Sequence, residues 1–270
     1  MIIFPNSKIN IGLNIVEKRP DGFHNIETIF YPIGLSDILE INISKDKMTF
    51  ENTGLAVENK RLETNLCFKA YQELNKDFSL SPVNIHLHKI VPFGAGLGGG
   101  SSDASFTLQA INSLMNLNLD QNILIKYAER VGSDCPFFIL NQPAYATEKG
   151  NVLKSIQLSL KGYILILIYP GIHVNTAKAY SQIKPVKPER KLSELIKQPI
   201  ENWKGLINND FEDSVFKEHP KLKEIKEYLY LKGAVYASMS GSGSSVYGIF
   251  KDNIELNGSF NNYFIWKELL

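Results

Sequence analysis

The sequence predicts a protein of mixed helices and strands that is divided into two domains. The chain has 270 residues, which is enough for two domains of ordinary size. Residues 7–16 alternate between apolar and polar side chains, as a strand with one buried face does. Residues 104–115 repeat their apolar side chains at helical spacing. A polar turn near Gly150 is the expected boundary between domains 1–150 and 151–270.

Composition and charge narrow the class of protein. With 44% hydrophobic and 21% charged residues, the chain can build an ordinary core. A formal net charge of +1 gives no general attraction to nucleic acid or to an anionic membrane. Cys67 and Cys135 are too few for a disulfide framework or a four-cysteine metal site. The N-terminus lacks a signal-peptide pattern and the longest apolar run, 163–169, is too short to span a bilayer, so we expect a cytoplasmic protein.

The first strand and the loop after it carry the first candidate residues. Lys8 and Asn10 share the polar face of the strand, which we expect to be exposed. Taken alone, Lys8 is then explained as a solvated strand residue. The turn at 20–22 (P-D-G) presents Phe23 and His24 at a loop tip. This pair is either a packed aromatic ring beside a surface histidine or a ligand contact.

Three further elements lead to a glycine-rich loop. Residues 27–43 predict two strands broken by Pro32 and Gly34. Thr64 is the candidate N-cap of a helix with an apolar side. Residues 83–87 alternate as a strand that runs directly into the loop.

The loop Val91–Asp103 reads V-P-F-G-A-G-L-G-G-G-S-S-D, and the rest of the chain is organised around it. Glycines leave no Cβ atoms in the way, so the backbone can approach a ligand closely. Ser101, Ser102 and Asp103 are residue types favoured at a helix start. A helix N-terminus offers unpaired N–H groups and a positive dipole, which suit a phosphate. We therefore expect a phosphorylated ligand at this loop, whose glycines are Gly94, Gly96, Gly98, Gly99 and Gly100.

Three known glycine patterns could account for parts of this loop. The glycines at 94, 96 and 99 match a dinucleotide fingerprint, with Asp120 at the expected distance. Asp120 is better explained as the N-cap of a helix at 121–131 that Gly132 closes. A Walker-type loop needs a lysine before its Ser/Thr, and residues 91–113 contain none. A tight turn explains one or two glycines but not five.

Asp134 lies in the segment 132–138, between a glycine and an apolar run. It is either a functional carboxylate or the N-cap of the turn that follows.

The C-terminal half continues with alternating strands and helices. Residues 163–169 predict a strand, 176–183 a helix and 184–191 a mobile surface loop. Pro220 opens a helix that runs to Leu231 and is closed by Gly233. Residues 234–250 then predict a strand, a tight glycine loop and a second strand, which a plain hairpin explains if taken alone.

Three motifs together resemble those of the galactokinase, homoserine kinase, mevalonate kinase and phosphomevalonate kinase superfamily. They lie at 7–11 (S-K-I-N-I), 92–102 and 239–243 (M-S-G-S-G). The segments 19–24 (R-P-D-G-F-H) and 132–138 (G-S-D-C-P-F-F) resemble most closely the family of 4-diphosphocytidyl-2-C-methyl-D-erythritol kinases. The resemblance covers nearly the whole chain, and the combination is more specific than any single motif.

The resemblance implies an α+β fold with two domains. The N-terminal domain would be like the second domain of ribosomal protein S5, with a left-handed β-α-β crossover, an exception to the usual hand. The C-terminal domain would be ferredoxin-like, with the active site in the cleft between them. The implied reaction uses ATP and Mg²⁺ to phosphorylate the 2-hydroxyl of 4-diphosphocytidyl-2-C-methyl-D-erythritol, in the non-mevalonate route to isoprenoids.

The resemblance also implies roles for single residues. Asp134 would accept the hydroxyl proton, and Lys8 would keep Asp134 ionised and neutralise the transferring phosphate. Asn209 and Asp210 would support the site. The metal ligands stay unassigned. The implied substrate contacts are Asn10, Phe23, His24 and Tyr180, with Gly241–Gly243 at the methylerythritol phosphate end, and the implied ATP contacts are Asn65, Leu66, Pro92, Gly94, Ala95, Gly96, Leu97, Gly98, Gly99, Gly100, Ser101 and Ser102.

Three positions depart from the commoner family pattern. Phe23 stands where Tyr is usual, Ala95 replaces a frequent Gly, and Asp103 stands where many relatives have Asn. We expect Asp103 to add a carboxylate near the phosphates. Rival functions are a mevalonate- or homoserine-type kinase, a non-catalytic nucleotide- or sugar-phosphate-binding module, and an RNA-binding protein, which the near-neutral charge disfavours.

Overall fold

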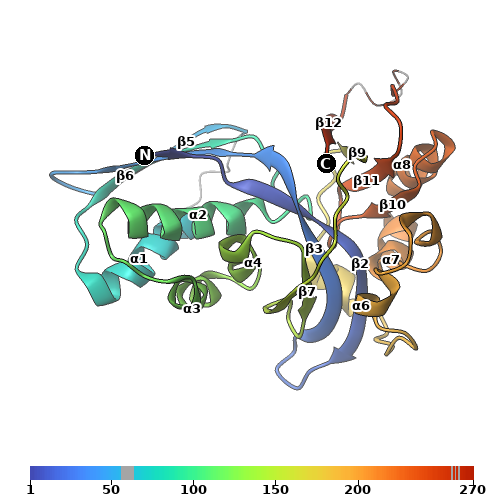
Figure 1. Ribbon diagram of the computed structural model, residues 1–270, viewed down its shortest axis with the longest axis horizontal. Coiled ribbons are helices and arrows are strands. Elements are labelled where there is room, and N and C mark those ends of the chain that lie inside the picture. Colours follow the sequence, from blue (N-terminus) through green and yellow to red (C-terminus); the bar gives the residue numbers. More distant parts are fainter. Residues whose placement is uncertain (56–63, 257, 259, 261) are drawn as a thin grey trace. The chain divides into compact units, whose positions relative to one another are not determined.

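The structure, a computed structural model, describes residues 1–55, 64–256, 258, 260 and 262–270. Its chain forms two compact units (Figure 1). The first comprises Met1–Lys8, Gly34–Phe93 and Gly98–Gln142, and the second comprises Ile9–Ile33, Gly94–Leu97 and Pro143–Leu270. Three four-stranded sheets and separate groups of helices in these residues confirm the predicted α+β class.

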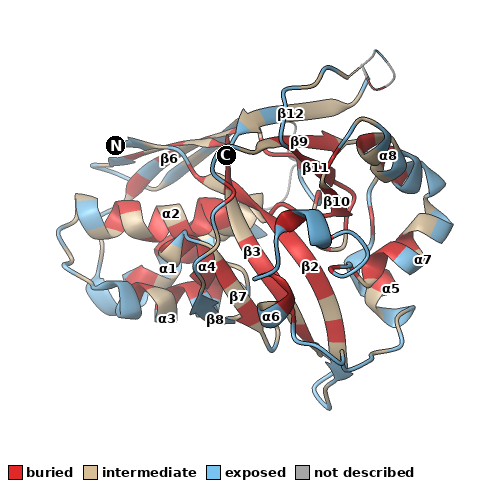
Figure 2. Ribbon diagram, turned by 45° about the vertical axis from the view of Figure 1, so that its right-hand side comes forward, coloured by how far each residue is buried: buried red, intermediate tan, exposed pale blue. Residues whose placement is uncertain are grey.

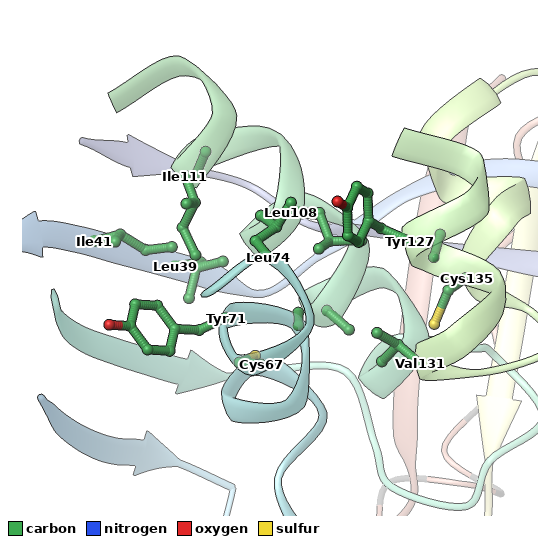
Figure 3. Close-up of a cluster of buried hydrophobic side chains, with 14 of the residues drawn as sticks. Leu39, Ile41, Cys67, Tyr71, Leu74, Leu108, Ile111, Tyr127, Val131 and Cys135 are labelled. Carbon is green, nitrogen blue, oxygen red and sulfur yellow. The ribbon is translucent and has the colours of Figure 1, made fainter. Parts of the chain in front are cut away.

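In its described residues, the first unit consists of one sheet and four helices. Strand β5 runs parallel to β6, and the other neighbours are antiparallel. Apolar side chains of α1, α2, α3 and the sheet form a common core (Figure 3). The unit β5-α1-β6 is a parallel β-α-β crossover, whose left hand stays a prediction. The sheet order is β1 (Ile2–Ile3), β4 (Ile38–Ile43), β6 (Val83–Lys89), β5 (Thr49–Gly54), and the helices are α1 (Leu66–Phe78), α2 (Gly99–Leu114), α3 (Gln121–Val131) and α4 (Cys135–Leu140).

The second unit holds the other two sheets. One has the order β2 (Asn6–Lys18), β3 (His24–Ser36), β7 (Ala144–Thr147), β8 (Val152–Ser155), with the first residues of β2 and the last of β3 counted in the first unit. The other has the order β10 (Tyr236–Met239), β11 (Val246–Phe250), β9 (Ile164–Tyr169), β12 (Phe264–Leu269). Its helical elements are α5 (Thr176–Ser181), α6 (Leu192–Leu195), η2 (Ile200–Asn202), α7 (Phe211–Glu218) and α8 (Pro220–Leu231).

Several predicted elements are confirmed. Strands β6, β9, β10 and β11 and helices α2, α5 and α8 lie where the sequence placed them. The side chain of Asp120 caps α3 by accepting a hydrogen bond from the Ile123 N–H at 2.9 Å, and Gly132 ends the helix. Residues 184–191 form neither helix nor strand. None of the helices in the described part of the chain is long and apolar enough to cross a bilayer.

Three local predictions are wrong. Both faces of β2 are buried from Ser7 to Leu13, because its polar side chains also find partners inside the protein (Figure 2). Strand β3 runs unbroken through Pro32, which lies beyond the residues 28–30 that pair with β7, so its missing N–H costs no hydrogen bond on that side. The N-cap of α1 is Asn65 rather than Thr64, since the Asn65 side chain accepts from the Cys67 N–H at 2.8 Å.

The division of the chain at residue 150 stays a prediction. Gly150 lies in the turn between β7 and β8, which pair with each other in one sheet of the second unit.

Candidate phosphate-transfer site

The glycine loop enters α2 through three glycines in the left-handed region. Gly94, Gly96 and Gly98 have φ of +60°, +78° and +71°, which other residues adopt only with strain. Gly98 is the N-cap of α2, and no side chain in the described part of the chain caps this terminus. The N–H groups of the first turn therefore lack intrahelical acceptors and can bind an anion.

The two serines at this helix start differ in their surroundings. Ser102 is buried, and its hydroxyl donates to the Asn6 carbonyl at 2.6 Å. Ser101 is half-buried. A phosphate at this end of α2 would meet backbone N–H groups and Ser101, whereas Ser102 fixes the helix to Asn6, the first residue of β2.

Lys8 lies against the start of α2, within the first unit. Its side chain is 3% exposed, and a Cβ added at Gly98 would lie 3.2 Å from Lys8 Cε. Burial lowers the pKa of Lys8 below its usual value, and the carboxylate of Asp134 opposes this shift. The explanation of Lys8 as a solvated strand residue is therefore wrong.

Asp134 precedes α4 and is half-buried. It occupies the N-cap position of α4, but its side chain makes no capping hydrogen bond. The capping explanation thus fails for its carboxylate, which instead interacts electrostatically with Lys8.

The adenine-side candidates lie at the start of α1 in the same unit. Asn65 uses its side-chain oxygen as the N-cap of α1. The half-buried Leu66 lies 3.7 Å from the position of a Cβ at Gly100, so the starts of α1 and α2 are close neighbours. Pro92 is buried in the segment that leads from β6 to the loop.

In the second unit, the loop Ser240–Ser245 between β10 and β11 packs on residues 94–97. The Ser240 hydroxyl donates to the Gly96 carbonyl at 2.8 Å, and the Ser245 N–H donates to the Ala95 carbonyl at 3.2 Å. A Cβ at Gly96 would lie 2.0 Å from the backbone carbonyl oxygen of Ser240, so only glycine fits there. The explanation of this loop as a plain hairpin is therefore incomplete, because the loop also holds residues 94–97 through hydrogen bonds to the carbonyls of Ala95 and Gly96.

Two asparagines hold the same loop in place. Asn209 donates from Nδ2 to the carbonyls of Met239 and Gly241, both at 2.8 Å. The Asn10 N–H donates to the Ser240 hydroxyl at 3.1 Å, and Asn10 Nδ2 donates to Thr28 at 2.9 Å. The side chain of Asn10 is therefore fixed before any ligand binds. Asp210 accepts from the Ile15 N–H at 2.6 Å, and burial raises its pKa.

The cytidine-side candidates also lie in the second unit. The rings of His24 and Tyr180 stack directly, with centroids 4.8 Å apart and planes at 18°. This stack leaves no room for a base between the two rings. Phe23 is 56% exposed, and Lys149 Nζ lies 4.9 Å from its ring centroid.

A buried charge cluster beside the loop was not predicted. Lys89 pairs with Asp37 and, at 2.7 Å, with Asp103. Asp103 is therefore paired inside the first unit rather than exposed on the loop, and its nearness to bound phosphates stays a prediction. The alternation of β6 was a usable signal, since Lys89 falls on the same face as the buried Val83, Ile85 and Leu87.

Two family models match the chain. The model for the GHMP kinases N terminal domain matches residues 65–142, and the model for the GHMP kinases C terminal matches residues 192–257. Among the relatives, a 4-diphosphocytidyl-2-C-methyl-D-erythritol kinase of Bacteroides fragilis is 53% identical over 93% of this chain and 92% of the relative. A protein of the same name from Parabacteroides distasonis is 48% identical over 99% of this chain and 98% of the relative.

Solved structures agree with these matches. A crystal structure of 4-(cytidine 5'-diphospho)-2C-methyl-D-erythritol kinase superposes with a TM-score of 0.76 at 30% identity, covering 92% of this chain and 90% of the other. The Methanococcus jannaschii mevalonate kinase shares the fold, with a TM-score of 0.69 at 16% identity over 99% of this chain and 97% of the other. From sequence identity over almost the full length, the chain belongs to the family of 4-diphosphocytidyl-2-C-methyl-D-erythritol kinases, a branch of the GHMP kinases.

Proposed function

We propose that this chain transfers the γ-phosphoryl group of ATP to the 2-hydroxyl of 4-diphosphocytidyl-2-C-methyl-D-erythritol. One geometric observation carries the chemistry: a buried ammonium group, Lys8, lies at the N-terminus of α2 and interacts with the carboxylate of Asp134. A positive charge held at an anion-binding helix end, beside a carboxylate, is the arrangement that phosphoryl transfer to an alcohol uses.

In the proposed step, Asp134 accepts the proton of the substrate hydroxyl as its oxygen attacks the γ-phosphorus. The bond between the γ-phosphorus and the oxygen bridging to the β-phosphate breaks, and ADP leaves. Lys8 stabilises the negative charge on the transferring group. Lys8 also attracts the Asp134 carboxylate electrostatically, which orients the base beside the transferring group.

The ATP phosphates are proposed to bind along residues 94–102, chiefly through backbone N–H groups. Asn65 and Leu66 would adjoin the adenine. Among the described residues, no group of three or more His, Cys, Asp or Glu side chains is arranged to hold a metal ion. Mg²⁺ would accompany ATP and share the charge of its phosphates, and no described residue is assigned as its ligand.

Substrate recognition is proposed for residues of the second unit. Phe23 and His24 contact the cytosine, and Tyr180 covers its other face after the His24–Tyr180 stack opens. Flat rings on a flat base give contact area at low entropic cost. Asn10 hydrogen-bonds the methylerythritol part, with Gly241–Gly243 beside it.

The test is release of ADP from Mg²⁺-ATP in the presence of 4-diphosphocytidyl-2-C-methyl-D-erythritol, with mevalonate and homoserine as controls. We expect turnover on the cytidyl substrate alone. Turnover on a control instead would keep the kinase chemistry and replace the acceptor. ATP binding without turnover on any of the three would favour a non-catalytic binding module.

Asp134→Ala tests the proposed base in the same assay. We expect kcat to fall about 10²–10⁴-fold, the usual contribution of general base catalysis, while ATP still binds. A near-normal rate in this variant would rule out the proposed role of Asp134.

A further inference from the structure

The strongest feature that the proposed reaction leaves unused is the buried charge cluster of Asp37, Lys89 and Asp103. All three side chains are nearly inaccessible to solvent, and all belong to the first unit. Burying three ionisable side chains is costly, and such a cluster seldom repays its cost in stability alone. The hydrogen bonds that the cluster makes to residues on both sides of the glycine loop give another reason for its presence.

The cluster joins the two ends of the glycine loop. Asp37 accepts backbone hydrogen bonds from Ile90 N–H at 2.6 Å and Val91 N–H at 2.8 Å, where the chain leaves β6. Lys89 donates to Asp37 and, at 2.7 Å, to Asp103 in α2, where the chain leaves the loop. One hydrogen-bonded group thus fixes the residues on both sides of the loop.

We propose that Asp37, Lys89 and Asp103 are positioning residues that preorganise the glycine loop for the phosphates of ATP. This inference rests on the proposed function. A loop with three glycines at positive φ has a large conformational entropy to lose when it closes around a ligand. Fixing its ends in advance lowers that loss and so raises affinity.

The link through Asp103 can be cut without leaving an unpaired charge. In Asp103→Leu, Lys89 still pairs with Asp37, but α2 loses its hydrogen bond to Lys89 at the end of β6. In Asp103→Asn, the side-chain oxygen still accepts from Lys89. The amide introduced by Asp103→Asn would also carry an N–H donor, which can replace the O–H of Asp103 if that carboxyl is protonated in the unaltered protein. Asp103→Asn therefore keeps the hydrogen bond from Lys89 and removes only the ionisable group.

The test measures the Kd for Mg²⁺-ATP without any acceptor, on the full chain, by isothermal titration calorimetry. We expect Asp103→Leu to raise this Kd about tenfold or more, because loop residues freed by the substitution must be ordered again when ATP binds. Asp103→Asn should bind ATP within about twofold of the unaltered protein. Leu74→Ala, a core substitution in α1, controls for lost stability and should lower the Tm without changing the Kd.

The outcomes separate this inference from the proposed function. If the unaltered protein binds no ATP, the proposed function itself fails. If it binds ATP and Asp103→Leu binds equally well, the cluster is only structural and the positioning role is wrong. Equal weakening in Asp103→Leu and Leu74→Ala would likewise assign the effect to stability.

Discussion

At the scale of single residues, Lys8 shows why a functional side chain is recognised from a sequence motif but not from the alternation of polar and apolar residues. The alternation of the first strand placed Lys8 on a polar face and predicted exposure, yet the side chain is buried. Alternation reports which residues share a face, but it does not report what covers that face. The resemblance of the segment 7–11 to a kinase motif, rather than its periodicity, identified Lys8.

Lys8→Met is expected to separate stability from activity. Burial lowers the pKa of Lys8, so its charged form is disfavoured in the folded protein. Methionine has a similar length and no charge to bury, so the free energy of unfolding should stay equal or rise at neutral pH. The kcat should fall about 10²-fold or more, because charge stabilisation at the transferring phosphate is lost.

Urea unfolding and the ADP-release assay measure the two effects. Lys126→Met is the matched control, since Lys126 is exposed on α3 of the same unit. It should change the free energy of unfolding by less than about 0.5 kcal/mol and leave turnover unchanged. Strong destabilisation by Lys8→Met would show that the folded protein gains from this charge, contrary to our reasoning.

At the scale of elements, the sequence predicted most helices and strands but not how the loops contact one another. The side-chain cap of Asp120 and the hairpin β10–β11 follow from local rules, and both are present. The contact of the hairpin loop with Gly96 joins segments that are 144 residues apart, and no local rule reaches that far. The cap of α1 was misassigned because Thr64 and Asn65 are both good N-cap residues.

Gly96→Ala tests the contact between the two glycine loops of the second unit. The new Cβ would lie 2.0 Å from the backbone carbonyl oxygen of Ser240, so either the loop at 94–97 or the loop at 240–245 must move. We expect turnover to fall about 10²-fold, since displacement of a positioning loop by about an ångström has an effect of that size. The measurements are kcat/KM for ATP and the Tm.

Gly205→Ala is the control for backbone strain. Gly205 has φ of +79°, close to the +78° of Gly96, but a Cβ there meets nothing within 4 Å. Both variants should lose about 1–2 kcal/mol of stability from the left-handed conformation. Only Gly96→Ala should lose activity. A similar loss of activity in both would show that strain, not the loop contact, is responsible.

At the scale of the whole molecule, the stability of the chain is linked to pH through the acid in its buried cluster. Burial raises the pKa of Asp103 to about 8, and the nearby Asp37 carboxylate adds to the shift, while Lys89 opposes it. The folded chain therefore holds a proton on Asp103 that the unfolded chain releases near the ordinary aspartate pKa of 3.8. Where the folded state binds more protons, stability falls as pH rises. No composition or net charge could predict this link, because it depends on where Asp103 points.

Asp103→Asn should remove this pH dependence. Protonated Asp103 contributes to the free energy of unfolding, and this contribution is fully present below the pKa that Asp103 has in the unfolded chain. It is lost as pH rises toward about 8, at a rate of at most about 1.4 kcal/mol per pH unit. The free energy of unfolding of Asp103→Asn, minus that of the unaltered protein, should therefore increase from about pH 5 to about pH 8 and then level off. Urea unfolding of both proteins at matched ionic strength gives this difference, in which contributions from the other titrating groups largely cancel. A difference that does not change with pH would mean that Lys89 holds Asp103 ionised, and that the cluster carries a net negative charge beneath the glycine loop.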